Sequence, residues 1–123
     1  MSNSRFKNVY TMIGPDAKIS GPINLKQGII IYGQVHGDIS TRGSIRIAKD
    51  GMVNGNIKCA SIIVGGKIMG HVESEGSVTL KKSSQLKGDI SYRKLHIEDG
   101  AKFEGQCDLI LDSNNIKVRN QSV

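Results

Sequence analysis

The chain contains few aromatic residues and no long apolar segment. Aromatic residues make up 4% of its 123 residues, and tryptophan is absent. No apolar run reaches the roughly 18 residues that a membrane helix requires, and helical periodicity is absent throughout. These absences argue against a membrane-spanning helix and against a helical fold. They favour a thin core filled by isoleucine, valine and leucine.

What the chain does contain is a repeated five-residue phrase centred on glycine. Residues 53–57, VNGNI, show its pattern of apolar, polar, glycine, polar and apolar residues. Further copies occupy residues 19–23, 35–39, 68–72, 86–90 and 103–107. A second motif, an apolar-x-apolar pair, recurs between the copies at Ile29/Ile31, Ile45/Ile47, Ile62/Val64, Val78/Leu80 and Leu95/Ile97. Residues 11–13 and 109–111 resemble degenerate copies of this pair, so the repeat covers residues 11–111.

The repeat predicts a β-solenoid. Alternating apolar and polar residues indicate short strands with one buried face. A unit of about 17 residues is too short for a strand, a crossover helix and a return strand, but it can hold three short strands and three corners that stack in parallel. The phrase glycines would point inward or sit at a bend that needs a positive φ. We expect the side chain of Ile47 to face the core and that of Ile63 to face outward. The six in-phase copies of the repeat argue against a loosely repetitive β-sandwich.

One folded domain, residues 11–111, is predicted between two flexible segments. Residues 1–10 form a polar N-terminal arm, and residues 112–123 form a C-terminal tail with a brief strand at 116–118. In the arm, Phe6 stands between Arg5 and Lys7, which makes these three residues a candidate membrane contact of marginal affinity per chain. Many chains held side by side would strengthen that contact through avidity.

The charge of the chain is positive but dispersed. The formal net charge is +6, and most lysines and arginines fall at positions expected to face outward. A solvated rod surface and a weak attraction to an anionic surface both fit this pattern. The basic stretches carry no interleaved aromatic residues and no known nucleic-acid motif, so no nucleic-acid partner is expected.

We expect no catalytic, cofactor or metal site. His36, His71 and His96 fall on different coils and faces, so they cannot converge as zinc ligands do. No glycine-rich loop has the Walker spacing that cradles a phosphate. Cys59 and Cys107 are nearly three coils apart, beyond disulfide reach, and are expected to be free and buried. Free thiols and an N-terminus without a signal-peptide core predict a cytoplasmic protein.

The ends of the predicted solenoid have no capping helix. Terminal coils expose unpaired backbone groups and the open end of the core, which repeat proteins normally cover. The candidate end contacts are Ile13 and Ile19 in the first coil and Phe103, Leu109 and Leu111 at the last. Stacking at both ends would propagate into a filament. We therefore expect a self-assembling scaffold that needs no nucleotide, and not an enzyme.

Several of these segments resemble the bactofilin family. The matching segments are residues 11–14 (TMIG), 35–39, 53–57, 86–90 and 95–105 (LHIEDGAKFEG), and the likeness extends over 11–107. The resemblance implies a right-handed parallel β-helix with a triangular core and bacterial filaments that assemble end to end without nucleotide. It also implies roles in cell shape, polarity or recruitment of cell-wall-modifying enzymes, with a short N-terminal segment that reaches the cytoplasmic membrane. Phe103 matches the hydrophobic residue near the C-terminal end that polymerisation requires in the family.

Two alternatives stay open at this point. Left-handed β-helix acyltransferases and carbonic-anhydrase-like trimers also have triangular coils, but they need a stricter hexapeptide repeat than the spacing of 15 to 18 residues between the phrase glycines. The second alternative is an adaptor that never polymerises. Electron microscopy without nucleotide separates these classes, because only the scaffold would form filaments and the enzyme fold would form a discrete trimer.

Overall fold

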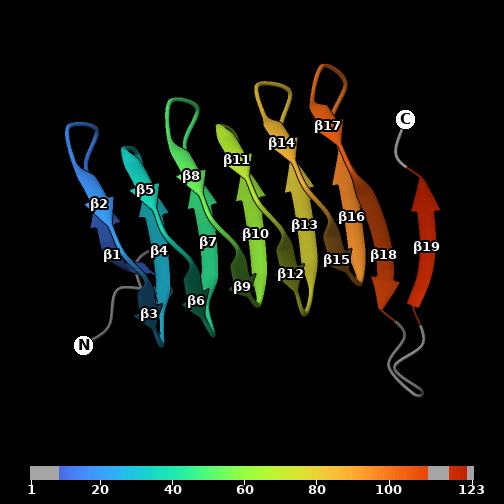
Figure 1. Ribbon diagram of the computed structural model, residues 1–123, viewed down its shortest axis with the longest axis horizontal. Helices are drawn as coiled ribbons and strands as arrows, with labels where there is room; N and C mark the ends of the chain where they lie inside the picture. The colour runs from blue at the N-terminus through green and yellow to red at the C-terminus, as the bar shows by residue number, and fades with distance from the viewer. Residues whose placement is uncertain (1–8, 111–116, 122–123) are drawn as a thin grey trace.

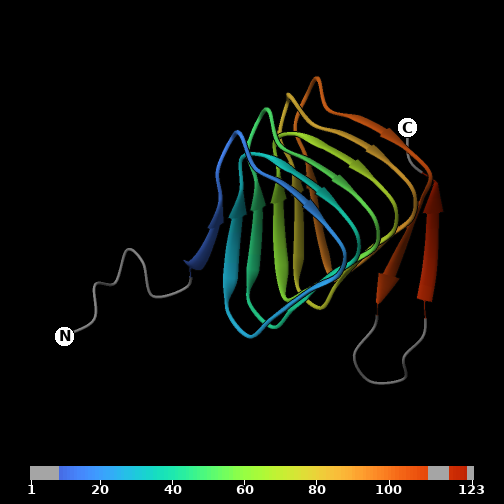
Figure 2. The ribbon, with the colours of Figure 1, turned by 60° about the vertical axis from the view of Figure 1, so that its left-hand side comes forward.

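The protein is built from strands alone, wound into a solenoid of six coils. The computed structural model describes residues 9–110 and 117–121, and no helix occurs in that part of the chain. Each coil contributes one strand to each of three sheets, which we call sheets A, B and C. The coils lie side by side along the long axis (Figure 1), and the sheets form three walls around one core (Figure 2). The predicted all-β solenoid of about six coils is confirmed.

The strands follow the chain from coil to coil. Sheet A contains, in spatial order, β1 (Val9–Ile13), β4 (Gly28–Ile31), β7 (Ser44–Ile47), β10 (Ser61–Val64), β13 (Ser77–Leu80) and β16 (Lys94–Ile97). Sheet B contains β2 (Lys18–Ser20), β5 (Gln34–His36), β8 (Met52–Asn54), β11 (Lys67–Met69), β14 (Gln85–Lys87) and β17 (Lys102–Glu104). Sheet C contains β3 (Ile23–Leu25), β6 (Ile39–Thr41), β9 (Ile57–Cys59), β12 (Val72–Ser74), β15 (Ile90–Tyr92), β18 (Gln106–Ile110) and β19 (Lys117–Gln121). All pairs are parallel except β18 with β19, which is antiparallel.

The two sequence motifs occupy different walls. The apolar-x-apolar pairs form sheet A, where Ile29 pairs with Ile45 and Ile31 pairs with Ile47. Each glycine phrase spans the corner between sheets B and C, with its first apolar residue on sheet B and its last on sheet C. One repeat therefore carries three strands and three corners, as its length predicts.

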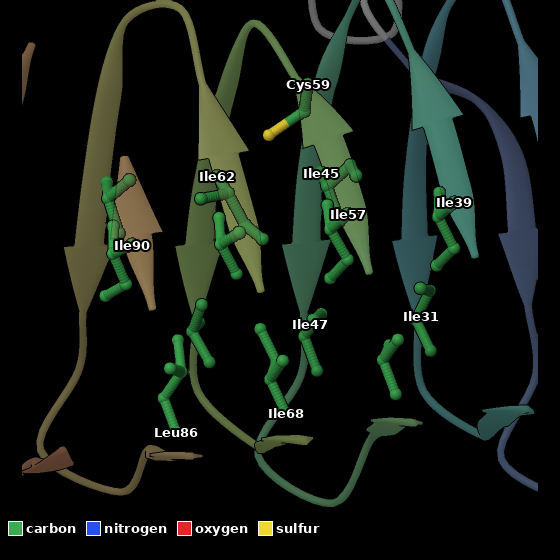
Figure 3. Close-up of a cluster of buried hydrophobic side chains, with 14 of the residues drawn as sticks. Ile31, Ile39, Ile45, Ile47, Ile57, Cys59, Ile62, Ile68, Leu86 and Ile90 are labelled. Atoms are coloured by element: carbon green, nitrogen blue, oxygen red, sulfur yellow. The ribbon is translucent and has the colours of Figure 1, made fainter. Parts of the chain in front are cut away.

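Stacking in register makes the core a set of continuous apolar rows. Figure 3 shows isoleucine and leucine side chains from all three walls filling the interior. Ile47 is 1% exposed, whereas Ile63 is half-buried on the outer face of sheet A, beside Arg46 of the neighbouring strand. The predicted phase of these strands is confirmed.

The phrase glycines form a column along the corner between sheets B and C. All six have positive φ, from +115° at Gly21 to +158° at Gly55. At Gly88, with φ of +139°, a Cβ atom would overlap the carbonyl oxygen of Gly70 in the preceding coil. Of the two alternatives that the sequence left open, the bend is therefore correct, and the close approach of successive coils adds a second requirement for glycine.

From Gly37 onward, the residue after each phrase glycine takes part in a hydrogen bond between successive coils. The Oδ1 atom of Asp38 accepts a hydrogen bond from the backbone N–H of Asn56 (2.9 Å), and Asn56 Oδ1 accepts from His71 N–H (3.0 Å). His71 Nδ1 accepts from Asp89 N–H (3.1 Å), and Asp89 Oδ1 accepts from Gln106 N–H (3.1 Å). We call this series the corner ladder. It satisfies backbone donors at a bend where the sheet hydrogen bonds are interrupted.

In the first coil, the equivalent corner position is occupied by Pro22. Proline has no backbone N–H, and its side chain cannot accept a hydrogen bond. The ladder of side-chain acceptors therefore begins at Asp38, one coil later.

The C-terminal part of the chain differs from the sequence prediction. Residues 11–13 belong to β1 in sheet A, as predicted, but Leu109 and Ile110 continue β18 in sheet C and do not start another sheet A strand. That prediction was wrong because the strand that begins at Gln106 runs on without a corner. The brief strand expected at 116–118 is replaced by the longer β19, which pairs with β18.

Candidate assembly interface

The solenoid ends on strand edges at both ends of the rod. At the N-terminal end these are the edges of β1, β2 and β3, and at the C-terminal end they are the edges of β16, β17 and β19. An exposed strand edge presents unpaired backbone N–H and C=O groups that can pair with another chain. Within the described residues, the two ends differ in sheet C, because the C-terminal end alone carries an antiparallel strand over its terminal coil.

One inward row of sheet A shows how the core opens at the ends. Ile13 begins this row and is 7% exposed. Ile47 and Leu80, inside the row, are no more than 1% exposed. Ile97 ends the row and is 41% exposed. The core is therefore nearly closed at Ile13 and open at Ile97.

Phe103 and Ile19 end the inward row of sheet B. Phe103 lies on β17, half-buried, next to Leu86 of β14. Ile19 lies on β2, also half-buried, next to Val35 of β5. Both residues pack against the buried core while part of their apolar surface faces the end of the rod. The structure thus places these two predicted end contacts at opposite ends of the same row.

Of the remaining predicted contacts, Leu109 alone lies in the described part of the chain. Leu109 lies on β18, half-buried, beside Tyr92 of the preceding coil and opposite Val118 of β19 in the strand register. Leu111, like Arg5, Phe6 and Lys7 in the arm, lies outside the described residues. The structure therefore brings Phe103 and Leu109 to the C-terminal end, with Ile13 and Ile19 at the other.

The sequence reasoning missed several residues of these ends. Leu95 and Ile97 belong to the last strand of sheet A, and Ile23 and Leu25 belong to the first strand of sheet C. None of the four is fully buried. The repeat held the necessary signal, because the first and last members of every inward row must lie at an end.

Electrostatic contacts fix the last corner between sheets A and B. Glu98 Oε1 accepts a hydrogen bond from the backbone N–H of Lys82 (3.1 Å), and Glu98 Oε2 lies 3.3 Å from Lys81 Nζ. These two contacts, the backbone donor first, lower the pKa of the Glu98 carboxyl. The corner that leads to Phe103 is thereby held against the preceding coil.

One groove on the described surface contains a cysteine, but the thiol of this residue is not activated. A groove of about 520 Å³ lies over sheet C, lined by residues of both charge signs that include Arg42, Lys58 and Glu73. Cys59 also lines it, but this thiol is 4% exposed and burial raises its pKa to about 12. Burial likewise raises the pKa of Cys107. A protonated, buried thiol is a poor nucleophile.

Metal-binding residue types are dispersed over the described surface. His36 lies on sheet B, His71 lies at the corner between sheets B and C, and His96 lies on sheet A. In the described ranges, no three histidine, cysteine or acidic side chains gather into a group that could hold a metal ion. Both cysteines are buried and free, as predicted.

Comparison with known proteins identifies the family. A family model described as bactofilin, polymer-forming cytoskeletal, matches residues 11–108. The protein belongs to the bactofilin family. The structure is also similar to the crystal structure of a Phe-to-Arg mutant of the bactofilin from Thermus thermophilus, with a TM-score of 0.68 and 26% sequence identity over 72% of this chain and 98% of that one. No curated protein matches the chain.

The family match covers nearly the whole solenoid of this bactofilin. It begins within β1 and ends within β18, so it includes Ile13, Ile19, Ile97 and Phe103, whereas Leu109 and β19 lie beyond it. In its described residues, this chain has no helix of the length and apolar character that crossing a membrane requires.

Proposed function

We propose that the protein is a structural scaffold that assembles end to end into filaments without nucleotide. The observation that carries this proposal is the continuity of the inward apolar rows, which run through the coils to both ends of the solenoid. Ile97 and Phe103 continue rows whose inner members are no more than 1% exposed. A second copy stacked on this end would bury them, as the next coil does inside the molecule.

Apolar burial and edge pairing supply the driving force, so the proposal needs no bound nucleotide. Gly65 and Gly66 form a corner, and Lys67 then opens a strand on sheet B. A phosphate-cradling loop would need a helix at that point. The description of the family as polymer-forming supports self-association as well.

The cellular role that we propose follows from family membership. The filaments would lie in the cytoplasm and serve cell shape, polarity or recruitment of cell-wall-modifying enzymes. Their end contacts would come from Ile13 and Ile19 at one end and from Phe103, Leu109 and Leu111 at the other. Arg5, Phe6 and Lys7 would supply a contact with the inner face of the cytoplasmic membrane.

Electron microscopy and sedimentation of the purified protein, without nucleotide, test the proposal. Filaments one solenoid wide are expected. A discrete trimer would contradict the proposal and favour a left-handed β-helix enzyme. A single particle that persists at high concentration, with salt varied, would contradict it and favour a non-polymerising adaptor.

A further inference from the structure

Sheet B presents a lysine-rich outer face. Its outward positions carry Lys18, Lys67, Lys87 and Lys102, all exposed, and one acidic residue, Glu104. The ion pairs found among the described residues join His71 to Asp89 and Lys81 to Glu98, so they leave these four lysines without a counter-charge at salt-bridge distance.

The other two walls have a different charge pattern. On sheet C, the lysine at an outward position, Lys58, lies directly opposite an acidic residue, Glu73, in the strand register. On sheet A, Arg46 lies between Ile30 and Ile63 of the neighbouring strands. On sheet B, Lys87 is likewise opposite Glu104, but Lys18, Lys67 and Lys102 have no acidic residue opposite them. Sheet A carries two cations, Arg46 and Lys94, so sheet B has the larger excess of positive charge, which attracts an anionic partner to one side of the rod.

Exposed methionine accompanies the lysines of sheet B. Met69 is 49% exposed, follows Lys67 on β11 by two residues, and pairs in register with Lys87 of β14. Met52, half-buried on β8, pairs in register with Lys67. Cations with apolar side chains between them are typical of surfaces that contact the headgroup region of a bilayer.

The lysines border two shallow grooves between neighbouring strands. One groove, of about 160 Å³, lies between β11 and β14 and is lined by Lys67, Met69 and Lys87. The other, of about 140 Å³, lies between β14 and β17 and is lined by Lys87, Lys102 and Glu104. Lys67 and Lys102 share one outward row, two strand spacings apart. A series of cationic recesses along one axis suits a surface that presents many phosphates.

We propose that sheet B is the face by which the rod lies on an anionic phospholipid bilayer. Lys67, Lys87 and Lys102 contact phosphate headgroups, and Met69 lies at the level of the headgroup and acyl boundary. A lysine near an anionic membrane strengthens partition about fivefold, so one copy binds weakly. The inference rests on the proposed filament for its strength, because assembly lines up one lysine-rich face per copy and binding then gains from avidity.

Flotation of preassembled filaments with vesicles tests this inference. The probe is a vesicle of mixed phosphatidylglycerol and phosphatidylcholine, compared with a vesicle of phosphatidylcholine alone. The test variant combines Lys67→Gln, Lys87→Gln and Lys102→Gln. The matched control, with the same change in net charge, combines Lys26→Gln, Arg42→Gln and Lys58→Gln on and beside sheet C.

Partition to the anionic vesicles should fall on the order of 100-fold in the sheet B variant, and by less than tenfold in the control. Added salt should weaken the binding of the unmodified protein. Equal losses in the two variants would show an effect of net charge alone and overturn the inference. Tighter binding of this face to a DNA duplex than to the vesicles would overturn it as well.

The arm needs a separate variant because it is a candidate membrane contact of its own. Combining Arg5→Gln, Phe6→Ala and Lys7→Gln removes that contact from the full chain. Binding that still depends on the sheet B lysines supports the inference, and complete loss of vesicle binding overturns it. Electron micrographs of the same samples separate a failure of assembly, which contradicts the proposed function, from a failure of binding by intact filaments, which contradicts only this inference.

Discussion

Phe103 lies directly beside Leu86 on neighbouring strands of sheet B, yet the two residues differ sharply in burial. Leu86 is 1% exposed because strands flank it on both sides. Phe103 is half-buried because β17 is the last strand of the sheet. The same inward position is thus a core site in one coil and an apolar end in the next, and it gives the most direct test of assembly.

Phe103→Arg should leave a folded rod that no longer forms filaments. A charge at an apolar contact is costly to remove from water, and no counter-charge follows it into the interface. The sedimented fraction should fall to the background level while the β-rich circular dichroism spectrum is kept. Phe103→Leu is the control and should still sediment. Unchanged filaments in the arginine variant would exclude Phe103 as an end contact.

Substitutions at Ile47 and Ile63 should separate the inner from the outer face of sheet A. Ile47→Ala should cost about 2–5 kcal/mol of unfolding free energy, because it leaves a cavity in a packed core. Ile63→Ala should cost less than about 1 kcal/mol, since this side chain is half-buried. Urea denaturation in the Phe103→Arg background removes the contribution of assembly. Arginine should be tolerated at residue 63 and prevent folding at residue 47, and equal effects would refute the assigned strand phase.

Gly88→Ala should destabilise the solenoid strongly. The φ of +139° is unfavourable for alanine, and its Cβ would overlap the carbonyl oxygen of Gly70. Backbone strain alone costs about 1–3 kcal/mol, and displacement of the neighbouring coil adds to it. Gly14→Ala is the matched control, because a Cβ there meets nothing within 4 Å. Equal denaturation midpoints for the two variants would show that the column of glycines is dispensable.

Two buried serines should respond oppositely to alanine. Ser74 Oγ lies 3.0 Å from the Ala60 carbonyl oxygen and 3.1 Å from that of Ser77, so Ser74→Ala should cost about 1–3 kcal/mol. Ser84 Oγ is buried and finds no hydrogen-bond partner among the described residues. Ser84→Ala should therefore raise the unfolding free energy by about 1 kcal/mol, because it removes an unsatisfied polar group. A loss of stability in Ser84→Ala, seen by the same denaturation assay, would indicate that this hydroxyl is satisfied in solution.

Cys59 should be inert at neutral pH and should make the fold sensitive to alkali. Burial raises its thiol pKa from 9.0 to about 12, so the folded state holds the proton more tightly than the unfolded chain does. Stability is fully present below pH 9.0 and falls as pH rises toward about 12. Cys59→Ala should flatten this alkaline decline in a series of thermal melts. Rapid alkylation of native Cys59 at neutral pH, compared with the urea-unfolded chain, would contradict the burial.

Much of the fold could be predicted from the sequence because a solenoid repeats its constraints. Ile31 and Ile47 face the core for the same reason, and Gly70 and Gly88 occupy the same bend, so each position is specified several times. The direction of Leu109 could not be predicted in this way. No later coil repeats it, and an apolar pair looks the same on sheet A and on sheet C.

The corner ladder also could not be predicted from patterns in the sequence. Asp38, Asn56 and His71 share one role, but their only common property is an acceptor atom two bonds beyond Cβ. A search for recurring residue types cannot detect that. The exposure of Ile97 is a similar case, because its sequence context matches that of the buried Leu80 and only its place at the end distinguishes them.

Pro22 sets where the corner ladder begins, and the coils after it could be duplicated. The internal coils that contain Asn56, His71 and Asp89 each donate one ladder hydrogen bond and accept another, so an extra copy of such a unit could be inserted among them and would find partners on both sides. A unit spliced ahead of Pro22 would meet a residue that offers it no N–H. Protein engineering could therefore lengthen this rod one coil at a time by inserting units after Pro22.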